Sequence, residues 1–222
     1  MAQTVQDFID YIVKTLQKEL AHCMPPLVDQ MIAEFGHDPY MILICCLLSL
    51  RAKDVVTIHV CRTLFSSIRT PEELLEIPLN ELERIIYKTG YYRNKATVIR
   101  EVSEIIIEHH DGQVPNSLEK LIAMKGVGIK TANLVIGLGF NIPAICVDTH
   151  VHRISNIFNL ITTKTPEQTE EALRKILPKK YWIEWNRILV MLGQNICTAP
   201  RPKCSACPLN AVCPKKGVTT HR

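Results

Sequence analysis

The sequence predicts an all-α protein, and three observations support this. Apolar side chains recur at the spacing of one helix face, as in Val5, Phe8, Ile9, Ile12 and Leu16. Residues that cap helix N-termini stand ahead of many such stretches. No stretch alternates apolar and polar residues as a half-buried strand would. We therefore expect roughly ten helices joined by short connections.

The cap signals recur along the whole chain. The expected helix starts are, in order, Asp38 with Pro39, Thr70-Pro71-Glu72-Glu73, Asn80 with Glu83, Asn116 or Ser117, and Thr165-Pro166-Glu167-Gln168. Gly90 is suited to end the helix that precedes it. Because the signals continue without a break, they show neither a linear domain boundary nor a repeat.

Composition is typical of a folded globule. The chain has 222 residues, of which 47% are hydrophobic, and this suits one large domain or two small ones. The longest apolar run, from Tyr40 to Leu50, is about half the length of a membrane span and predicts a buried helix. The first residues carry acids and lack the basic start of a signal peptide, so we expect a cytoplasmic protein.

Charge is distributed unevenly, although the net charge is only +4. The last acidic residue is Glu184. Six basic residues and no acid follow it: Arg187, Arg201, Lys203, Lys215, Lys216 and Arg222. Such a positive surface suits a polyanionic partner. A solvated basic tail is the alternative.

The nine cysteines fall into two groups. Five lie in apolar surroundings and are expected to fill the core: Cys23, Cys45, Cys46, Cys61 and Cys146. The other four, at Cys197, Cys204, Cys207 and Cys213, fall within 17 residues. In a cytoplasmic protein such a cluster more often holds metal than disulfides. The spacing alone allows either a tetrahedral zinc or an iron–sulfur cluster.

A tight turn joins two expected helices between Asn116 and Phe140. The first helix ends near Met124, Gly126-Val127-Gly128 forms the turn, and the second runs from about Ile129 to Gly139. Glycine lets another backbone approach closely, and N–H groups at a helix start suit a phosphate. On these grounds alone, a plain connection between helices is equally acceptable.

Several segments in one order carry a resemblance that covers nearly the whole chain. They are CLLSLRAKD at 46–54, KTGYYRNKA at 88–96, KGVGIKTAN at 125–133, AICVDTHVHRI at 144–154, and the cysteine tail. Together they resemble the helix-hairpin-helix DNA glycosylases of the endonuclease III group. The resemblance implies a six-helix lobe at residues 33–142, and a second lobe formed by residues 1–32 and 143–222.

Lys130 and Asp148 are the catalytic residues that the resemblance implies. Lys130 lies in the first turn of the second helix, whose dipole disfavours an ammonium and so favours a nucleophilic amine. Without the resemblance, Lys130 is a solvated lysine and Asp148 a helix cap. With it, Asp148 faces Lys130 across a DNA cleft. The implied enzyme excises oxidised pyrimidines through a lysine Schiff base and cleaves the abasic site by β-elimination.

The resemblance also implies DNA contacts. Tyr91 stands where the family places a wedge residue, although a core aromatic is the alternative. Arg51 stands where the family commonly has glutamine, and Lys53 also departs from the pattern, which puts lesion and opposite-base preference in doubt. His150 is a candidate phosphate neighbour. His150 and His152 are spaced so that they do not share a helix face, which argues against a metal pair.

For the cysteine tail, the resemblance implies a [4Fe-4S] cluster held by all four cysteines. The cluster would set Arg201 and Lys203 against DNA phosphates. The expected partner is duplex DNA with damaged bases or abasic sites, bound by a monomer associated with the nucleoid. Two rival functions stay open. One is a mismatch-directed or other-lesion glycosylase of the same superfamily, and the other is a non-catalytic iron–sulfur DNA-binding or redox protein.

Overall fold

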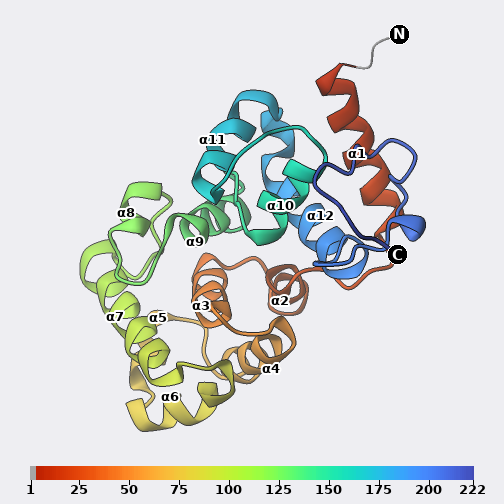
Figure 1. The fold of residues 1–222 in the computed structure, drawn as a ribbon. Helices are drawn as coiled ribbons and strands as arrows, with labels where there is room; N and C mark the ends of the chain where they lie inside the picture. Colours follow the sequence, from red (N-terminus) through yellow and green to blue (C-terminus); the bar gives the residue numbers. More distant parts are fainter. Residues whose placement is uncertain (1–3) are drawn as a thin grey trace. The chain divides into compact units, whose positions relative to one another are not determined.

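The computed structural model describes residues 4–222, and over this range the chain forms helices and no strand (Figure 1). The expected all-α class is therefore confirmed. The chain divides into two compact units. One unit runs from Pro26 to Ile142, and the other combines the segment that ends at Pro25 with Pro143–Arg222. Within the described range, no helix has both the length and the apolar character needed to cross a membrane.

The unit from Pro26 to Ile142 is built around one buried helix, α3. Its helices are α2 (Leu27–Phe35), α3 (Pro39–Ser49), α4 (Asp54–Phe65), α5 (Pro71–Glu76), α6 (Leu79–Ile86), α7 (Tyr92–His110), α8 (Leu118–Ile122) and α9 (Ile129–Leu134), with short turns η1 (Tyr87–Thr89) and η2 (Val135–Gly139). α3 contacts α2, α4, α7 and α9. Every side chain from Tyr40 to Leu48 is buried, as the apolar run predicts.

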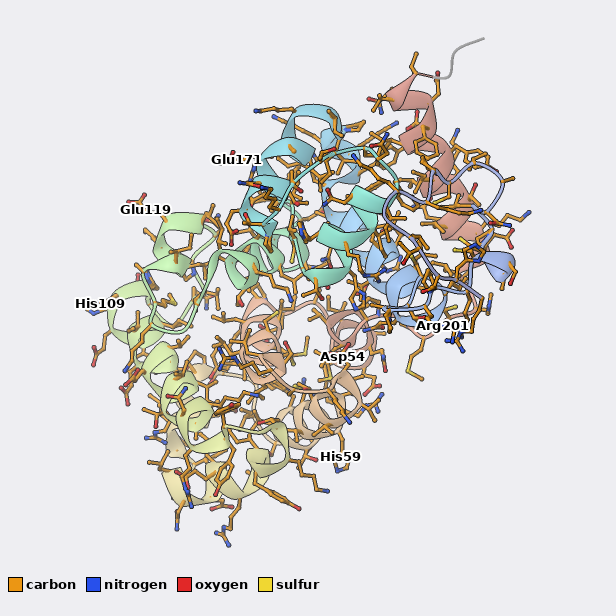
Figure 2. The ribbon with its side chains drawn as sticks, viewed as in Figure 1. Asp54, His59, His109, Glu119, Glu171 and Arg201 are labelled. Atoms are coloured by element: carbon orange, nitrogen blue, oxygen red, sulfur yellow. The ribbon has the colours of Figure 1, made fainter. Side chains whose placement is uncertain are left out.

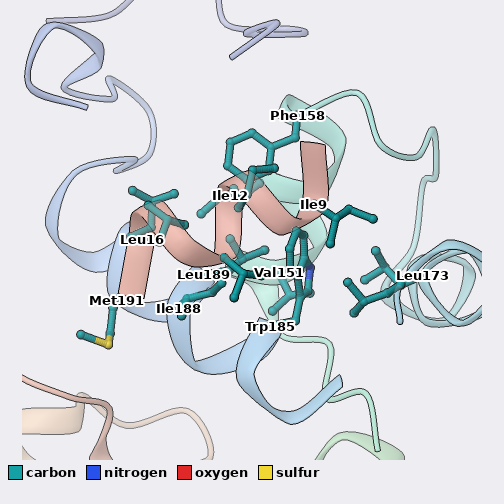
Figure 3. Close-up of a cluster of buried hydrophobic side chains, with 14 of the residues drawn as sticks. Ile9, Ile12, Leu16, Val151, Phe158, Leu173, Trp185, Ile188, Leu189 and Met191 are labelled. Atoms are coloured by element: carbon teal, nitrogen blue, oxygen red, sulfur yellow. The ribbon is translucent and has the colours of Figure 1, made fainter. Parts of the chain in front are cut away.

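The other unit joins the two ends of the chain. It contains α1 (Val5–Glu19), α10 (Thr149–Ile157), η3 (Lys179–Tyr181), α11 (Pro166–Ile176), α12 (Trp182–Asn195) and η4 (Cys204–Ala206). Its core surrounds Trp185, which is fully buried and donates a 3.2 Å hydrogen bond from Nε1 to Ser155 Oγ. Figure 3 shows Ile9 and Ile12 of α1 in this core. Each such apolar side chain contributes roughly 1.5–3 kcal/mol on burial.

The division of the chain differs from the expected lobe boundary. We expected residues 1–32 to belong with the C-terminal part, but the chain divides between Pro25 and Pro26. The reason is α2, which contacts both α3 and α4 and buries Leu27, Val28 and Met31. Burial of these side chains decides to which unit α2 belongs. The Pro25-Pro26 segment favours a turn in the chain, but it does not indicate which unit the next helix joins.

Most of the expected helix caps are present. Asp38 Oδ1 accepts from Tyr40 N at 2.7 Å, and Thr70 forms a capping box with Glu73. Ser117 and Thr165 cap α8 and α11. The cap expected at Asn80 is wrong. Pro78 precedes α6 with its φ at −56°, so the helix begins at Leu79 and Asn80 lies inside its first turn.

Candidate functional site

The turn Gly126-Val127-Gly128 presents backbone, not side chains. Val127 is buried, and its N–H donates to Met124 O at 3.1 Å. Gly126 has φ of +86°, and a Cβ there would meet Val98 of α7 at 2.6 Å. Gly128 precedes α9, and a Cβ there would meet nothing within 4 Å. The turn is therefore packed against α7 on one side and open on the other, where a backbone could approach.

Lys130 is the second residue of α9 and its side chain is exposed. Lys130 lies in the same unit as α3, and its positive charge acts on the buried thiol of Cys46. Burial raises the pKa of Cys46 to about 12, and the positive charge of Lys130 acts against this rise. The exposed Lys130 side chain therefore lies near the C-terminal half of α3.

Asp148 caps α10. Its Oδ1 accepts from Val151 N at 2.8 Å, and the side chain is half-buried. The cap fixes the orientation of the carboxylate at the helix start, where the dipole favours a negative charge. The capping role weighed from sequence is confirmed.

Arg51 and Tyr91 contact each other, and both line one pocket. The Arg51 guanidinium lies 5.9 Å from the centre of the Tyr91 ring. Both residues have positive φ, 53° for Arg51 and 49° for Tyr91, which is uncommon outside glycine. Tyr91 is 68% exposed, so the alternative of a core aromatic is wrong. The pocket is lined by Leu47, Leu50, Arg51, Tyr91, Asn94, Lys95, Val98 and Gly126.

The two histidines of α10 have different surroundings. His150 packs against α12, since a Cβ added to Gly193 would lie 2.3 Å from His150 Nδ1. His152 Nδ1 lies 2.7 Å from Thr169 Oγ1 of α11. The two rings therefore engage different helices, as their spacing predicts. Gly193 was not singled out from sequence, although a glycine inside a helical pattern is a signal of close packing.

The four C-terminal cysteines line one pocket. Apolar residues form much of the remaining lining, namely Ile157, Phe158, Leu192, Ile196, Pro202 and Val218, and the polar residues Lys203, Asn210 and Lys215 also contribute. Burial raises the pKa of Cys207 to about 11 and also raises the pKa values of Cys197 and Cys213. The charges of neighbouring cysteines of the group act in the same direction.

Arg153 joins α10 to the first of these cysteines. Its guanidinium lies 3.6 Å from Cys197 Sγ and donates to the Cys197 carbonyl oxygen. Sequence reasoning did not identify Arg153, and the segment AICVDTHVHRI offered no local signal for it. A cation at this place offsets the negative charge that a set of thiolates would carry.

In the basic loop between the first two cysteines, Lys203 is engaged by another part of the chain, whereas the Arg201 side chain is exposed. Arg201 is exposed and projects from the surface of the C-terminal segment (Figure 2). Its carbonyl accepts from Thr198 Oγ1 at 3.1 Å. Lys203 is exposed as well, but its Nζ donates to Asn195 O at 3.1 Å, at the last turn of α12. Arg201 is therefore the better placed of the two for a phosphate.

Comparison with known proteins identifies the family. The profile of the HhH-GPD superfamily base excision DNA repair proteins matches residues 44–179, which is more than half of the chain. The chain belongs to the HhH-GPD superfamily. Endonuclease III of Thermotoga maritima is 46% identical over 176 residues, covering 79% of this chain and 83% of the relative. Endonuclease III of Bacillus subtilis is 35% identical over 201 residues, covering 88% and 92%.

A solved structure of the same family supports this assignment. A trapped endonuclease III–DNA covalent intermediate matches with a TM-score of 0.81 and 34% identity, over 96% of each chain. This HhH-GPD protein is therefore an endonuclease III-type base excision DNA glycosylase, and the expected family, fold and enzyme class are confirmed. A purely non-catalytic role does not agree with this family.

The cysteine pocket can be tested against the two candidate metals. In residues 4–222, no group of three or more His, Cys, Asp or Glu side chains is arranged to hold a metal ion. A single zinc needs four sulfurs at about 2.3 Å from one centre. A [4Fe-4S] cluster takes one thiolate at each iron, so its ligands surround a wider space. Four thiols around one pocket, with the Arg153 cation beside Cys197, have the ligand chemistry that such a cluster needs.

Proposed function

We propose that this glycosylase excises oxidised pyrimidines from duplex DNA and cleaves the resulting abasic site by β-elimination. The observation that carries the proposal is the exposed lysine Lys130 in the first turn of α9, directly after the Gly126-Val127-Gly128 turn. The related endonuclease III has been trapped as a covalent intermediate with DNA, which requires a nucleophile on that enzyme. Lys130 is the residue of this chain suited to that role.

The turn and the basic loop hold the DNA strand. The N–H groups at the start of α9 bind a phosphate, because Gly128 leaves room for the sugar–phosphate backbone, while Gly126 lets the turn pack against Val98. Arg201 adds a phosphate contact, with Lys203 and His150 as weaker candidates. These contacts carry no sequence information and set the register of the enzyme on the duplex.

Tyr91 and Arg51 handle the base pair that the enzyme opens. The target base must leave the stack, at a cost of a few kcal/mol. The exposed Tyr91 ring enters the gap, and Arg51 beside it contacts the base left behind. Because arginine replaces the family's usual glutamine here, we expect the opposite-base preference of this chain to differ from that of relatives with glutamine. A mismatch or another lesion as the preferred target is the second candidate, and Arg51 is the residue that favours it.

Base removal develops positive charge at C1′ of the deoxyribose. The Asp148 carboxylate stabilises that charge, and its helix cap keeps it oriented without further reorganisation. The neutral amine of Lys130 bonds to C1′ as the C1′–N bond to the base breaks, and the base leaves with a proton. Opening of the sugar ring, in which the C1′–O4′ bond breaks and O4′ takes up a proton, then gives a protonated imine between Lys130 and C1′.

Strand cleavage follows from the imine. The positive nitrogen of the imine acidifies the C2′ proton, and a general base removes this proton. The C3′–O3′ bond then breaks, with the phosphate as leaving group. Water then hydrolyses the imine and restores Lys130. Asp148 is the candidate to move protons in these steps.

Cys197, Cys204, Cys207 and Cys213 would hold a [4Fe-4S] cluster in this scheme. When bound, the cluster supplies folding energy to a tail that has little core of its own. Leu209, which is 1% exposed, is the one tail side chain between these cysteines that enters the main core of its unit. The tail residues then present Arg201 to the DNA as a fixed loop. We expect the enzyme to act as a monomer on chromosomal DNA.

Borohydride trapping on an abasic duplex tests the proposal. Wild type should form a covalent adduct, and Lys130→Ala should not. The matched control is Lys120→Ala, which removes an exposed lysine from the neighbouring α8 and should keep the adduct. A wild-type protein that forms no adduct, or a Lys130→Ala variant that still forms one, would refute the Schiff base.

A further inference from the structure

α7 contains a buried lysine that the reaction scheme does not use. Lys95 is 7% exposed, and its Nζ donates to Leu48 O at 2.7 Å and to Thr89 O at 2.8 Å. Burial lowers the pKa of Lys95 to about 8, with the neighbouring Cys61 acting weakly in the opposite direction. Burying an ammonium is costly, and an apolar side chain of the same length would fill the space without that cost.

The first acceptor lies at the end of α3. There the helix ends in turns whose hydrogen bonds join residues three positions apart. Leu50 N donates to Leu47 O at 3.3 Å, and Ala52 N donates to Ser49 O at 3.1 Å. The Leu48 carbonyl, between these two acceptors, receives the Lys95 ammonium instead. Arg51 follows three residues later with its positive φ.

The second acceptor lies at the end of η1. Thr89 is buried, and its Oγ1 donates to Ile86 O at 2.9 Å. Gly90 and Tyr91 follow, both with positive φ. Lys95 N also donates to Tyr91 O at 3.0 Å. One residue therefore ties the turn that carries Tyr91 on both sides, through its backbone and through its side chain.

We propose that Lys95 is a positioning residue that holds Arg51 and Tyr91 in the arrangement needed to open a base pair. This inference rests on the proposed function of those two side chains. Left-handed conformations at non-glycine residues persist only where the surroundings enforce them. Carbonyls at the ends of helical segments carry partial negative charge, so an ammonium is well suited to bind two of them at once. An apolar side chain at residue 95 would fill the space but would release both turns.

A double-mutant cycle separates this role from a general loss of stability. Single-turnover base excision from a lesion duplex is measured for wild type, Lys95→Met, Arg51→Ala/Tyr91→Ala, and the combination of all three changes. Because Lys95 acts through Arg51 and Tyr91, Lys95→Met should slow excision about tenfold in wild type and less than about twofold in the background that lacks both side chains. Val102→Ala, a core truncation on the same helix, is the control for destabilisation and should be additive with both backgrounds.

A second readout does not depend on the chemistry. A duplex with 2-aminopurine opposite the lesion becomes more fluorescent when its stack is opened. Wild type should raise the signal, and Lys95→Met should raise it much less at saturating protein. Lys95→Gln, which keeps an N–H donor, should restore part of the effect and serves if Lys95→Met does not fold.

The outcomes are distinguishable. Equal slowing by Lys95→Met in both backgrounds, or an unchanged fluorescence signal in a folded Lys95→Met protein, would overturn the role of Lys95. A wild-type protein that opens the base stack but removes no base would refute the proposed reaction, and it would not contradict the role of Lys95.

Discussion

The Arg51 guanidinium stacks over the Tyr91 ring at 5.9 Å, and the two residues come from turns that are 40 positions apart in the sequence. Each turn has a left-handed backbone at this point. The pair brings a planar cation and an aromatic ring together in the lining of one pocket. This relationship makes opposite-base preference a testable property of the chain.

Arg51→Gln should change which opposite base is tolerated, because glutamine cannot stack on Tyr91 as a planar cation does. We expect excision rates with different opposite bases to shift relative to one another by about tenfold. A panel of lesion duplexes with each opposite base measures this. Trapping on an abasic duplex is the control and should stay near wild type. Identical opposite-base profiles for the two proteins would rule out a role for Arg51.

Asp148→Asn separates chemistry from capping. Asparagine caps a helix about as well as aspartate, so the free energy of unfolding should change by less than about 0.5 kcal/mol. The charge at C1′ loses its stabilising carboxylate, so single-turnover base removal should slow by about 100-fold while DNA binding stays. Denaturant titration, binding and rate measurements on one preparation decide the matter. An unchanged rate would exclude the electrostatic role.

Gly193→Ala should destabilise the unit that contains α10 and α12. The new Cβ would lie 2.3 Å from His150 Nδ1 and 2.8 Å from His150 Cγ. We expect a net loss of about 1–3 kcal/mol, because the overlap outweighs the better helix propensity of alanine. Thermal unfolding measures this. His150→Ala should remove most of the penalty when combined with Gly193→Ala, and a penalty that persists in the double variant would contradict the packing described here.

The stability of the protein should depend on pH through Lys95. Its pKa is lowered to about 8 in the folded state, whereas an unfolded lysine keeps its ordinary value near 10.4. Between these pH values the unfolded chain binds more protons, so the free energy of unfolding rises with pH. Denaturant titrations from pH 7 to pH 10 should show wild type gaining up to about 3 kcal/mol relative to Lys95→Met. A difference that is flat with pH would contradict the buried ammonium.

Cys207→Ser should lower both the bound iron and the thermal stability of the purified protein. A cluster that contributes folding energy to the tail takes that energy away when a ligand is lost. Iron and acid-labile sulfide are measured together with thermal unfolding. Cys23→Ser, a half-buried cysteine outside the pocket, is the control. Zinc in place of iron in the wild-type protein would show that the cluster assignment is wrong.

Local signals in the sequence were sufficient for the helices and many of their starts. Asp38, Thr70, Ser117 and Thr165 cap helices as their residue types predict, because a side-chain oxygen beside free N–H groups acts over only a few residues. Asn80 shows the limit of such signals. A proline two positions earlier set the start of α6, and both patterns look acceptable when read alone.

The sequence by itself also determined which reactive groups the protein has. They are an amine after a glycine turn, a capping carboxylate, and four thiols at a characteristic spacing. Tertiary structure decided which groups meet. It brought Lys95 to the carbonyls of Leu48 and Thr89, Arg51 to Tyr91, and Arg153 to Cys197. No residue pattern reports these contacts, because they depend on how buried faces pack, and all but the Lys95–Thr89 contact join segments far apart in the chain. Burial of α2 against α3 and α4 moved the unit boundary for the same reason.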